Sequence, residues 1–204
     1  MKRFIALLGL LFLSFTAVNA QDVFDYKEPV TWLGLDFSSL KLIKTDEVIT
    51  DSELQTKYFP GWNELILNEP KKYDIAKATG RSSVENDITA VTAINAKAKA
   101  DFITDNIAAF QHLDNASVKQ MVKKYNLKGK SGIGLVFIVE AMDKTRKEAS
   151  VWVTFIDMST KEVLLSQPVT GESGGFGFRN YWAASFNKIL KAMPVDMRIW
   201  KKGK

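Results

Sequence analysis

Residues 170–182, TGESGGFGFRNYW, combine four glycines with side chains that could bind an anion. Backbone N–H groups between Gly174 and Gly177, at the start of a helix, would present partial positive charge to a ligand. The guanidinium of Arg179 can form paired hydrogen bonds with carboxylate or phosphate groups, whereas Glu172 brings opposing negative charge. The candidate ligand-binding residues are Glu172, Gly174, Gly175, Arg179 and Tyr181.

The same loop has a structural interpretation, which we favour. Glycine adopts positive φ angles at little cost, so a Gly-rich segment lets the chain leave a strand, reverse and pass close beneath a helix. Phe176 and Phe178 would then fill the layer between the strand and the helix. Joints between strands and helices need this backbone freedom more often than ligands do, so we expect a joint.

A second possible chemistry is acid–base hydrolysis by two carboxylates, which needs neither His nor Cys. Five carboxylates lie on predicted strands or at their ends: Asp36, Glu140, Asp143, Asp157 and Glu172. Each of them is also an ordinary turn-forming or solvated residue. No catalytic residue is assigned, and we favour a protein that is not an enzyme.

The signals for metal, nucleophile or nucleotide chemistry are weak. His112 is the only histidine and cysteine is absent, so a metal site would lack its usual nitrogen and sulfur ligands. Residues 128–131, KGKS, imitate the end of a phosphate-binding loop, but position 124 is Lys where the pattern needs Gly. We expect no metal, no cofactor and a surface or capping role for His112.

Alternation and helical spacing predict the elements that would position these residues. Residues 31–38, TWLGLDFS, alternate like a strand, and a short helix is expected around Trp62. Gly80 marks a stop. Residues 84–93 are rich in β-branched side chains and are assigned to a strand, and Asn115 stands where a helix cap belongs.

The carboxyl-terminal half has the clearest pattern. Residues 132–142 and 149–157 are apolar at successive positions, which indicates two strands buried on both faces. A third strand is expected over residues 162–170, and short turns favour an antiparallel meander. A final helix is expected over residues 181–193, with Asn180 as its cap and Pro194 as its stop. The prediction is an α+β fold: a single mixed or antiparallel sheet with a carboxyl-terminal three-strand meander and helices packed on it.

The amino terminus has the composition of a secretory signal peptide. Lys2 and Arg3 precede an apolar run at residues 4–15, and small residues follow before Gln21. We therefore predict a cleaved leader at residues 1–20 and a single domain at residues 21–204, periplasmic or secreted. No transmembrane segment is expected after cleavage, and without cysteine there is no residue for a bacterial lipid anchor.

The charge pattern argues against nucleic-acid binding. Removing Lys2 and Arg3 lowers the formal net charge from +5 to +3. The remaining cations alternate with Asp and Glu instead of forming the basic stripe that nucleic-acid binding requires. Lys201, Lys202 and Lys204 are interpreted as a solvated tail.

Part of the chain resembles a known group of envelope domains. The run SVKQMVKKYNLKGKSGIGLVFIVE is similar to the helix, polar loop and buried strand of TolB amino-terminal-like and curli-secretion-lipoprotein-like domains. VTFIDMSTKEVLLSQPVTG resembles their next two strands, and the chain also resembles small exported proteins of Bacteroidetes-type bacteria. The resemblance implies an envelope role, often in protein–protein assembly, and transfers no catalytic residue.

Two functions remain open. We favour a non-enzymatic binding or assembly role in the cell envelope, with an envelope protein or a second copy of the chain as partner. The alternative is a small-ligand-binding protein or a carboxylate-dependent hydrolase that uses the Gly-rich loop at residues 171–182.

Overall fold

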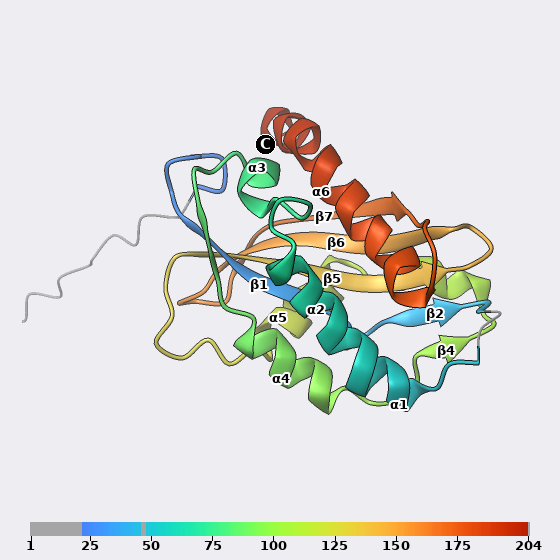
Figure 1. Ribbon diagram of the computed structural model, residues 1–204. Coiled ribbons are helices and arrows are strands. Elements are labelled where there is room, and N and C mark those ends of the chain that lie inside the picture. The colour runs from blue at the N-terminus through green and yellow to red at the C-terminus, as the bar shows by residue number, and fades with distance from the viewer. Residues whose placement is uncertain (1–21, 46–47, 204) are drawn as a thin grey trace, which may run out of the picture.

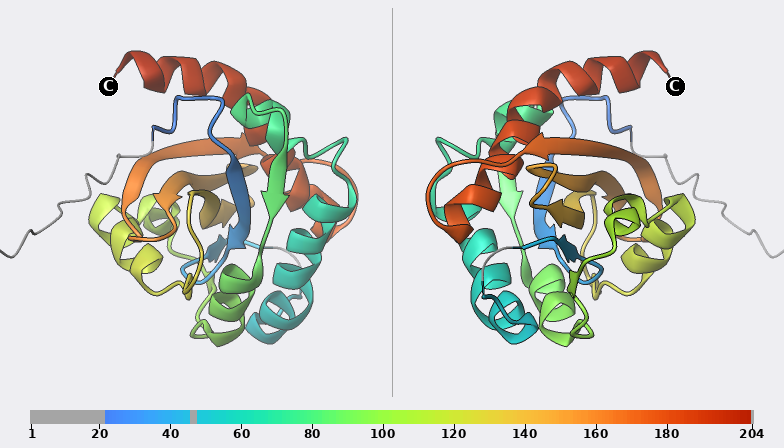
Figure 2. Two further views of the ribbon diagram at one scale, coloured as in Figure 1. Left: turned by 90° about the vertical axis from the view of Figure 1, so that its left-hand side faces the viewer. Right: turned by 90° about the vertical axis from the view of Figure 1, so that its right-hand side faces the viewer.

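The computed structural model describes residues 22–45 and 48–203, so the predicted leader lies outside the described residues. These residues form a seven-stranded sheet with helices on both faces (Figures 1 and 2). The expected combination of a single mixed sheet with packed helices is confirmed.

Seven strands make up the sheet: β1 (Val30–Asp36), β2 (Lys41–Ile43), β3 (Val84–Asn86), β4 (Ile103–Thr104), β5 (Ile133–Asp143), β6 (Glu148–Asp157) and β7 (Val163–Glu172). Along one edge, β5 pairs in parallel with two strands: first with β1 and then, nearer its carboxyl end, with β2. β3 and β4 extend that side of the sheet in parallel. β6 and β7 complete the predicted antiparallel meander on the other side. The parallel pairs mean that the sheet is mixed, and the purely antiparallel alternative is wrong.

The helices form two layers around the sheet. They are α1 (Asp51–Glu53), α2 (Phe59–Asn68), α3 (Ile75–Thr79), α4 (Thr89–Lys97), α5 (Asn115–Lys123) and α6 (Phe178–Lys202), with a π-helical turn η1 (Leu54–Tyr58) and a 3-10 turn η2 (Ile107–Gln111). On one face, Trp62 of α2 and Phe186 of α6 pack with Phe37 in the larger core cluster. On the other face, Val91 of α4 and Val122 of α5 belong to a second cluster. Because both faces are covered, β5 and β6 are buried almost throughout, as their sequences predicted.

Two buried asparagines complete the edge of β1. The side chain of Asn63 accepts the N–H of Leu35 at 2.8 Å and donates to its carbonyl at 3.1 Å. Asn95 accepts the N–H of Phe37 at 2.7 Å and donates to the Leu35 carbonyl at 2.9 Å. An amide side chain carries the same donor and acceptor as a peptide group. The two amides therefore take the place of a neighbouring strand where β3 no longer pairs with β1.

The strand predicted over residues 84–93 is mostly wrong. β3 ends at Asn86, and α4 begins at Thr89, whose N–H and hydroxyl donate to Asp87 at 3.2 and 2.6 Å. Val91 is completely buried against the sheet. Burial of one helix face outweighs the weak strand preference of the β-branched residues.

Three predicted helix boundaries also need correction. α6 starts from Gly177 instead of Asn180, and it continues through Pro194 to its end at Lys202. The cap of α5 is Asp114, one residue before the predicted Asn115, and its carboxylate accepts a backbone hydrogen bond in the first turn at 2.7 Å.

Candidate functional site

Residues 173–177 join β7 to α6 and are called here the Phe176 loop (Figure 1). Its backbone is held at two points. The N–H of Ser173 donates to the carbonyl of Lys147 at 2.8 Å, and the N–H of Gly174 donates to the carbonyl of Tyr181 at 3.0 Å. The first bond ties the loop to the hairpin between β5 and β6, and the second ties it to the first turn of α6.

Gly171 brings the strand and the helix into direct contact. A Cβ atom at this position would lie 2.9 Å from both Cγ1 of Ile189 and the carbonyl carbon of Ser185, and it would overlap the Ser185 carbonyl oxygen. Only glycine leaves enough room for the two backbones at this distance. The geometry at Gly171 is that of a close structural joint.

The two phenylalanines of the loop point in opposite directions. Phe178 is buried and makes edge contacts with Tyr58 at 4.7 Å between ring centroids and with Trp182 at 6.5 Å. Phe176 is 96% exposed, so the expectation that it fills the layer beneath the helix is wrong. The glycines on its two sides have φ angles of +103° and +77°, a conformation that suits glycine and turns Phe176 outward.

The predicted ligand-binding side chains have separate neighbours. Glu172 forms an ion pair with Lys188 at 3.1 Å, and Nζ of Lys144 lies 4.0 Å from the ring centroid of Tyr181. Arg179 is exposed, and its carbonyl accepts a hydrogen bond from the Trp62 indole at 2.8 Å. Gly174 and Tyr181 are brought together by their backbone bond, and Gly175 supplies one of the positive φ angles.

Asp36 is fully buried at the end of β1. Its carboxylate accepts the hydroxyl of Tyr125 at 2.5 Å and the N–H of Ser38 at 2.8 Å. Burial raises the pKa of the Asp36 carboxyl, and the hydrogen bonds from Tyr125 and Ser38 oppose this rise. Burial, together with the neighbouring Asp36, raises the pKa of the Tyr125 hydroxyl well above its ordinary value. The pair links β1 to the segment after α5 inside the smaller core cluster.

The other candidate carboxylates are also held by the protein. Glu140 is buried and accepts three hydrogen bonds: from the N–H of Leu113 at 2.5 Å, the hydroxyl of Ser150 at 2.7 Å and the indole of Trp152 at 3.2 Å. Asp143 and Asp157 accept backbone hydrogen bonds from the turns that follow their strands. These contacts are those of structural carboxylates.

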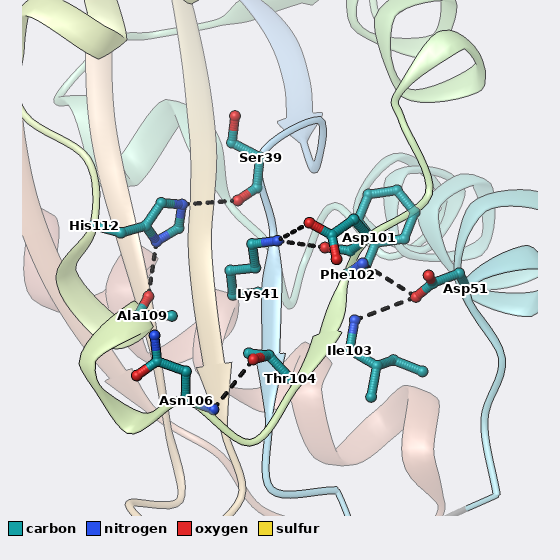
Figure 3. Close-up of polar contacts among 10 residues, drawn as sticks. All are labelled: Ser39, Lys41, Asp51, Asp101, Phe102, Ile103, Thr104, Asn106, Ala109 and His112. Carbon is teal, nitrogen blue, oxygen red and sulfur yellow. Dashed lines mark hydrogen bonds and ion pairs between the residues drawn. The ribbon is translucent and has the colours of Figure 1, made fainter.

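His112 lies beside the turn between β1 and β2 (Figure 3). Its Nε2 lies 3.0 Å from the carbonyl of Ser39 and its Nδ1 lies 2.7 Å from the carbonyl of Ala109. Carbonyl oxygens only accept hydrogen bonds, so a neutral imidazole satisfies one contact and the imidazolium satisfies both. Nearby, Lys41 donates to both the side chain and the carbonyl of Asp101, at 2.9 and 2.5 Å. The polar groups along this hollow, about 280 Å³ in volume, thus connect chain segments to one another.

The imitation of a phosphate-binding loop has a structural role. Lys130 forms an ion pair with Asp87 and donates to the hydroxyl of Thr89 at 3.1 Å, which ties the segment before β5 to the start of α4. Within residues 22–45 and 48–203, no group of three His, Asp or Glu side chains is arranged as metal ligands would be.

No protein-family model matches the chain, and no curated protein is significantly similar to it. In the part of the chain that the structure describes, no helix has the length and apolarity needed to cross a bilayer.

Proposed function

We propose that this protein is exported to the bacterial envelope, periplasmic or secreted, and acts there by binding another protein without catalysing a reaction. The observation that carries the proposal is the exposure of Phe176 on a loop whose backbone is hydrogen-bonded at Ser173 and Gly174. The resemblance to TolB-like and curli-secretion-lipoprotein-like envelope domains supports the same compartment and the same kind of role.

An exposed phenylalanine on a constrained loop is suited to anchor a complex. Burying a Phe side chain in a partner contributes about 1.5–3 kcal/mol, and aromatic anchors are common among the residues that dominate protein interfaces. The two backbone bonds of the loop reduce the conformational entropy lost when a partner binds. Phe176 therefore offers apolar area at low entropic cost.

The charges around the loop indicate the chemistry of the partner. Lys144 lies over Tyr181, and Lys147 and Arg179 are exposed beside the loop. Glu172, the carboxylate at the start of the loop, is paired with Lys188. We propose a partner surface with an apolar pocket for Phe176 and acidic residues around its rim. Such complementary charge raises the association rate and selects the partner.

Photo-crosslinking tests the proposal. A photoreactive amino acid at position 176 is expected to capture a specific protein in the cells that produce this chain, whereas one at exposed Lys119 on α5 should not. Once the captured protein is purified, Phe176→Ala should weaken binding about 30-fold, the equivalent of about 2 kcal/mol. Lys119→Ala is the matched control and should bind as the wild type does.

Several results would reject the binding proposal. Equal capture from both positions, or unchanged affinity after Phe176→Ala, would remove Phe176 as the anchor. Capture of a second copy of the chain would identify the partner as this same protein, in a homo-oligomer. Export is tested separately by mass spectrometry of envelope and culture-medium fractions. The protein recovered there should have the mass of a chain that begins at Gln21.

Anion binding at the start of α6 is the second candidate. The helix has no side-chain cap, because its cap residue is Gly177, and Arg179 is exposed beside its first N–H groups. A titration with inorganic phosphate should then give saturable binding that Arg179→Ala abolishes. Hydrolytic activity would in addition require a second carboxylate to meet Glu172 at the loop.

A further inference from the structure

The carboxyl-terminal half of α6 presents a second surface, far from the Phe176 loop. Figures 1 and 2 show that this end of the helix extends beyond the sheet. At 1.5 Å per residue, the 25 residues of α6 separate its two ends by about 35 Å. A ligand of this end therefore binds independently of the proposed partner at Phe176.

One face of this half-helix is cationic. The core side is formed by buried residues that include Met193 and Met197. With 100° per residue, the opposite side carries residues spaced by three and four positions, called here the α6 stripe: Lys191, Val195, Arg198, Ile199 and Lys202. None of these residues is acidic. The single carboxylate of α6, Asp196, lies on the flank of the helix, where burial raises its pKa.

The α6 stripe also has apolar residues at its centre. Val195 is 49% exposed and Ile199 is 59% exposed, and they lie one helical turn apart between the cations. Exposed aliphatic residues in a row of Lys and Arg are typical of helices that lie at the surface of an anionic membrane.

The neighbouring segment before and within α3 adds further cations. Lys71, Lys72 and Lys77 line a surface hollow of about 190 Å³ together with Lys191. Lys72 is paired with Glu69 at 3.3 Å, whereas Lys71 and Lys77 are exposed beside the stripe. Asp74, which caps α3, is the acidic residue in this hollow.

We propose that the α6 stripe, with Lys71 and Lys77, binds the surface of a membrane that contains anionic lipids. The cations pair with lipid phosphates, and Val195 and Ile199 enter the boundary between headgroups and acyl chains. Nucleic acid fits less well, because the stripe has no exposed aromatic ring to stack on bases and its aliphatic pair finds no partner on a phosphodiester backbone.

Vesicle sedimentation with the purified protein tests the proposal. We expect binding to phosphatidylcholine vesicles with about one third phosphatidylglycerol, little binding to phosphatidylcholine alone, and weaker but not abolished binding as salt is raised. The triple variant Lys191→Glu, Arg198→Glu, Lys202→Glu should weaken binding by at least about 100-fold, since each cation near such a surface contributes about fivefold. The double variant Val195→Ser, Ile199→Ser should remove the part of the binding that survives at high salt.

The matched control is Lys97→Glu, Lys119→Glu, Lys123→Glu, which makes the same change in net charge on α4 and α5, across the sheet from α6. All substituted residues are exposed, and circular dichroism verifies that each variant keeps its fold. The control should bind vesicles as the wild type does. The proposal is overturned if the control weakens binding as much as the triple variant, or if the Ser variant binds like the wild type at every salt concentration. It is also overturned if the wild type binds polyglutamate or DNA but not anionic vesicles.

Discussion

Replacing Gly171 by Ala tests whether β7 and α6 form a close joint. The added methyl group would lie 2.9 Å from carbon atoms of Ile189 and Ser185 and would overlap the Ser185 carbonyl oxygen. Ordinary contacts of this kind begin at about 3.4 Å, so the strand and the helix must separate by at least about 0.5 Å. Overpacking of this size costs about 1–3 kcal/mol.

The sign of the change in stability is informative because Gly171 has no left-handed φ, so alanine can adopt its backbone conformation without strain. Without the close contact, Ala in this strand would stabilise the fold by about 0.5–1 kcal/mol. Gly174→Ala is the control: its Cβ would meet nothing within 4 Å, and its φ is also ordinary. We expect Gly174→Ala to be neutral or slightly stabilising.

Urea and thermal unfolding, followed by tryptophan fluorescence, measure the difference. At about 2–4 °C per kcal/mol for a chain of this size, Gly171→Ala should lower Tm by about 2–12 °C, with a lower urea midpoint and an unchanged m value. If Gly171→Ala is as stable as Gly174→Ala, the two elements are not in contact as described, and the joint interpretation fails.

Three further predictions concern the core and α6. Burial raises the folded-state pKa of Asp36 above its ordinary value of 3.8, so folding is coupled to proton uptake. The stability of the wild type relative to Asp36→Asn should therefore fall as pH rises from about 3.8 through the folded-state pKa. Urea unfolding at several pH values checks this, and parallel curves would contradict it. Asn95→Ala leaves the N–H of Phe37 without its partner and should cost about 1–3 kcal/mol by the same assay. Pro194→Ala restores a backbone donor inside α6 and should stabilise the fold by about 1–3 kcal/mol, seen as a higher Tm; a lower Tm would show that the proline suits its place in the helix.

The parts of the fold that sequence predicted well are those with strong local patterns. β5 and β6 carry long apolar runs because both of their faces are covered, and the short turns between strands specify the meander. The parallel pairing of β1 with β5 joins residues about a hundred positions apart, and no local pattern encodes such a contact. The same limit applies to Asn63 and Asn95, whose amides act as a surrogate strand only after α2 and α4 have packed on β1.

The loop joins β7 to α6 and Phe178 is buried as expected, but the inward direction expected for Phe176 was wrong. Alternation along a strand specifies which side chains point inward, and this rule ends where β7 ends. Beyond that point two positive φ angles, at Gly175 and Gly177, decide the direction. Glycine in the sequence permits such angles without requiring them.

Pro194 illustrates how tertiary burial can override a strong local signal. Proline inside a helix removes one backbone hydrogen bond and costs about 3 kcal/mol, which is why the helix was expected to stop there. In the structure α6 continues for two further turns, and this extension buries Met197 to 2% exposure. Burial of a methionine contributes about 1.5–3 kcal/mol, a gain similar in size to the cost of the proline. The same extension places Arg198 and Lys202 on a regular helix in register with Lys191, so residues that would be a solvated tail in a shorter helix become one continuous cationic face.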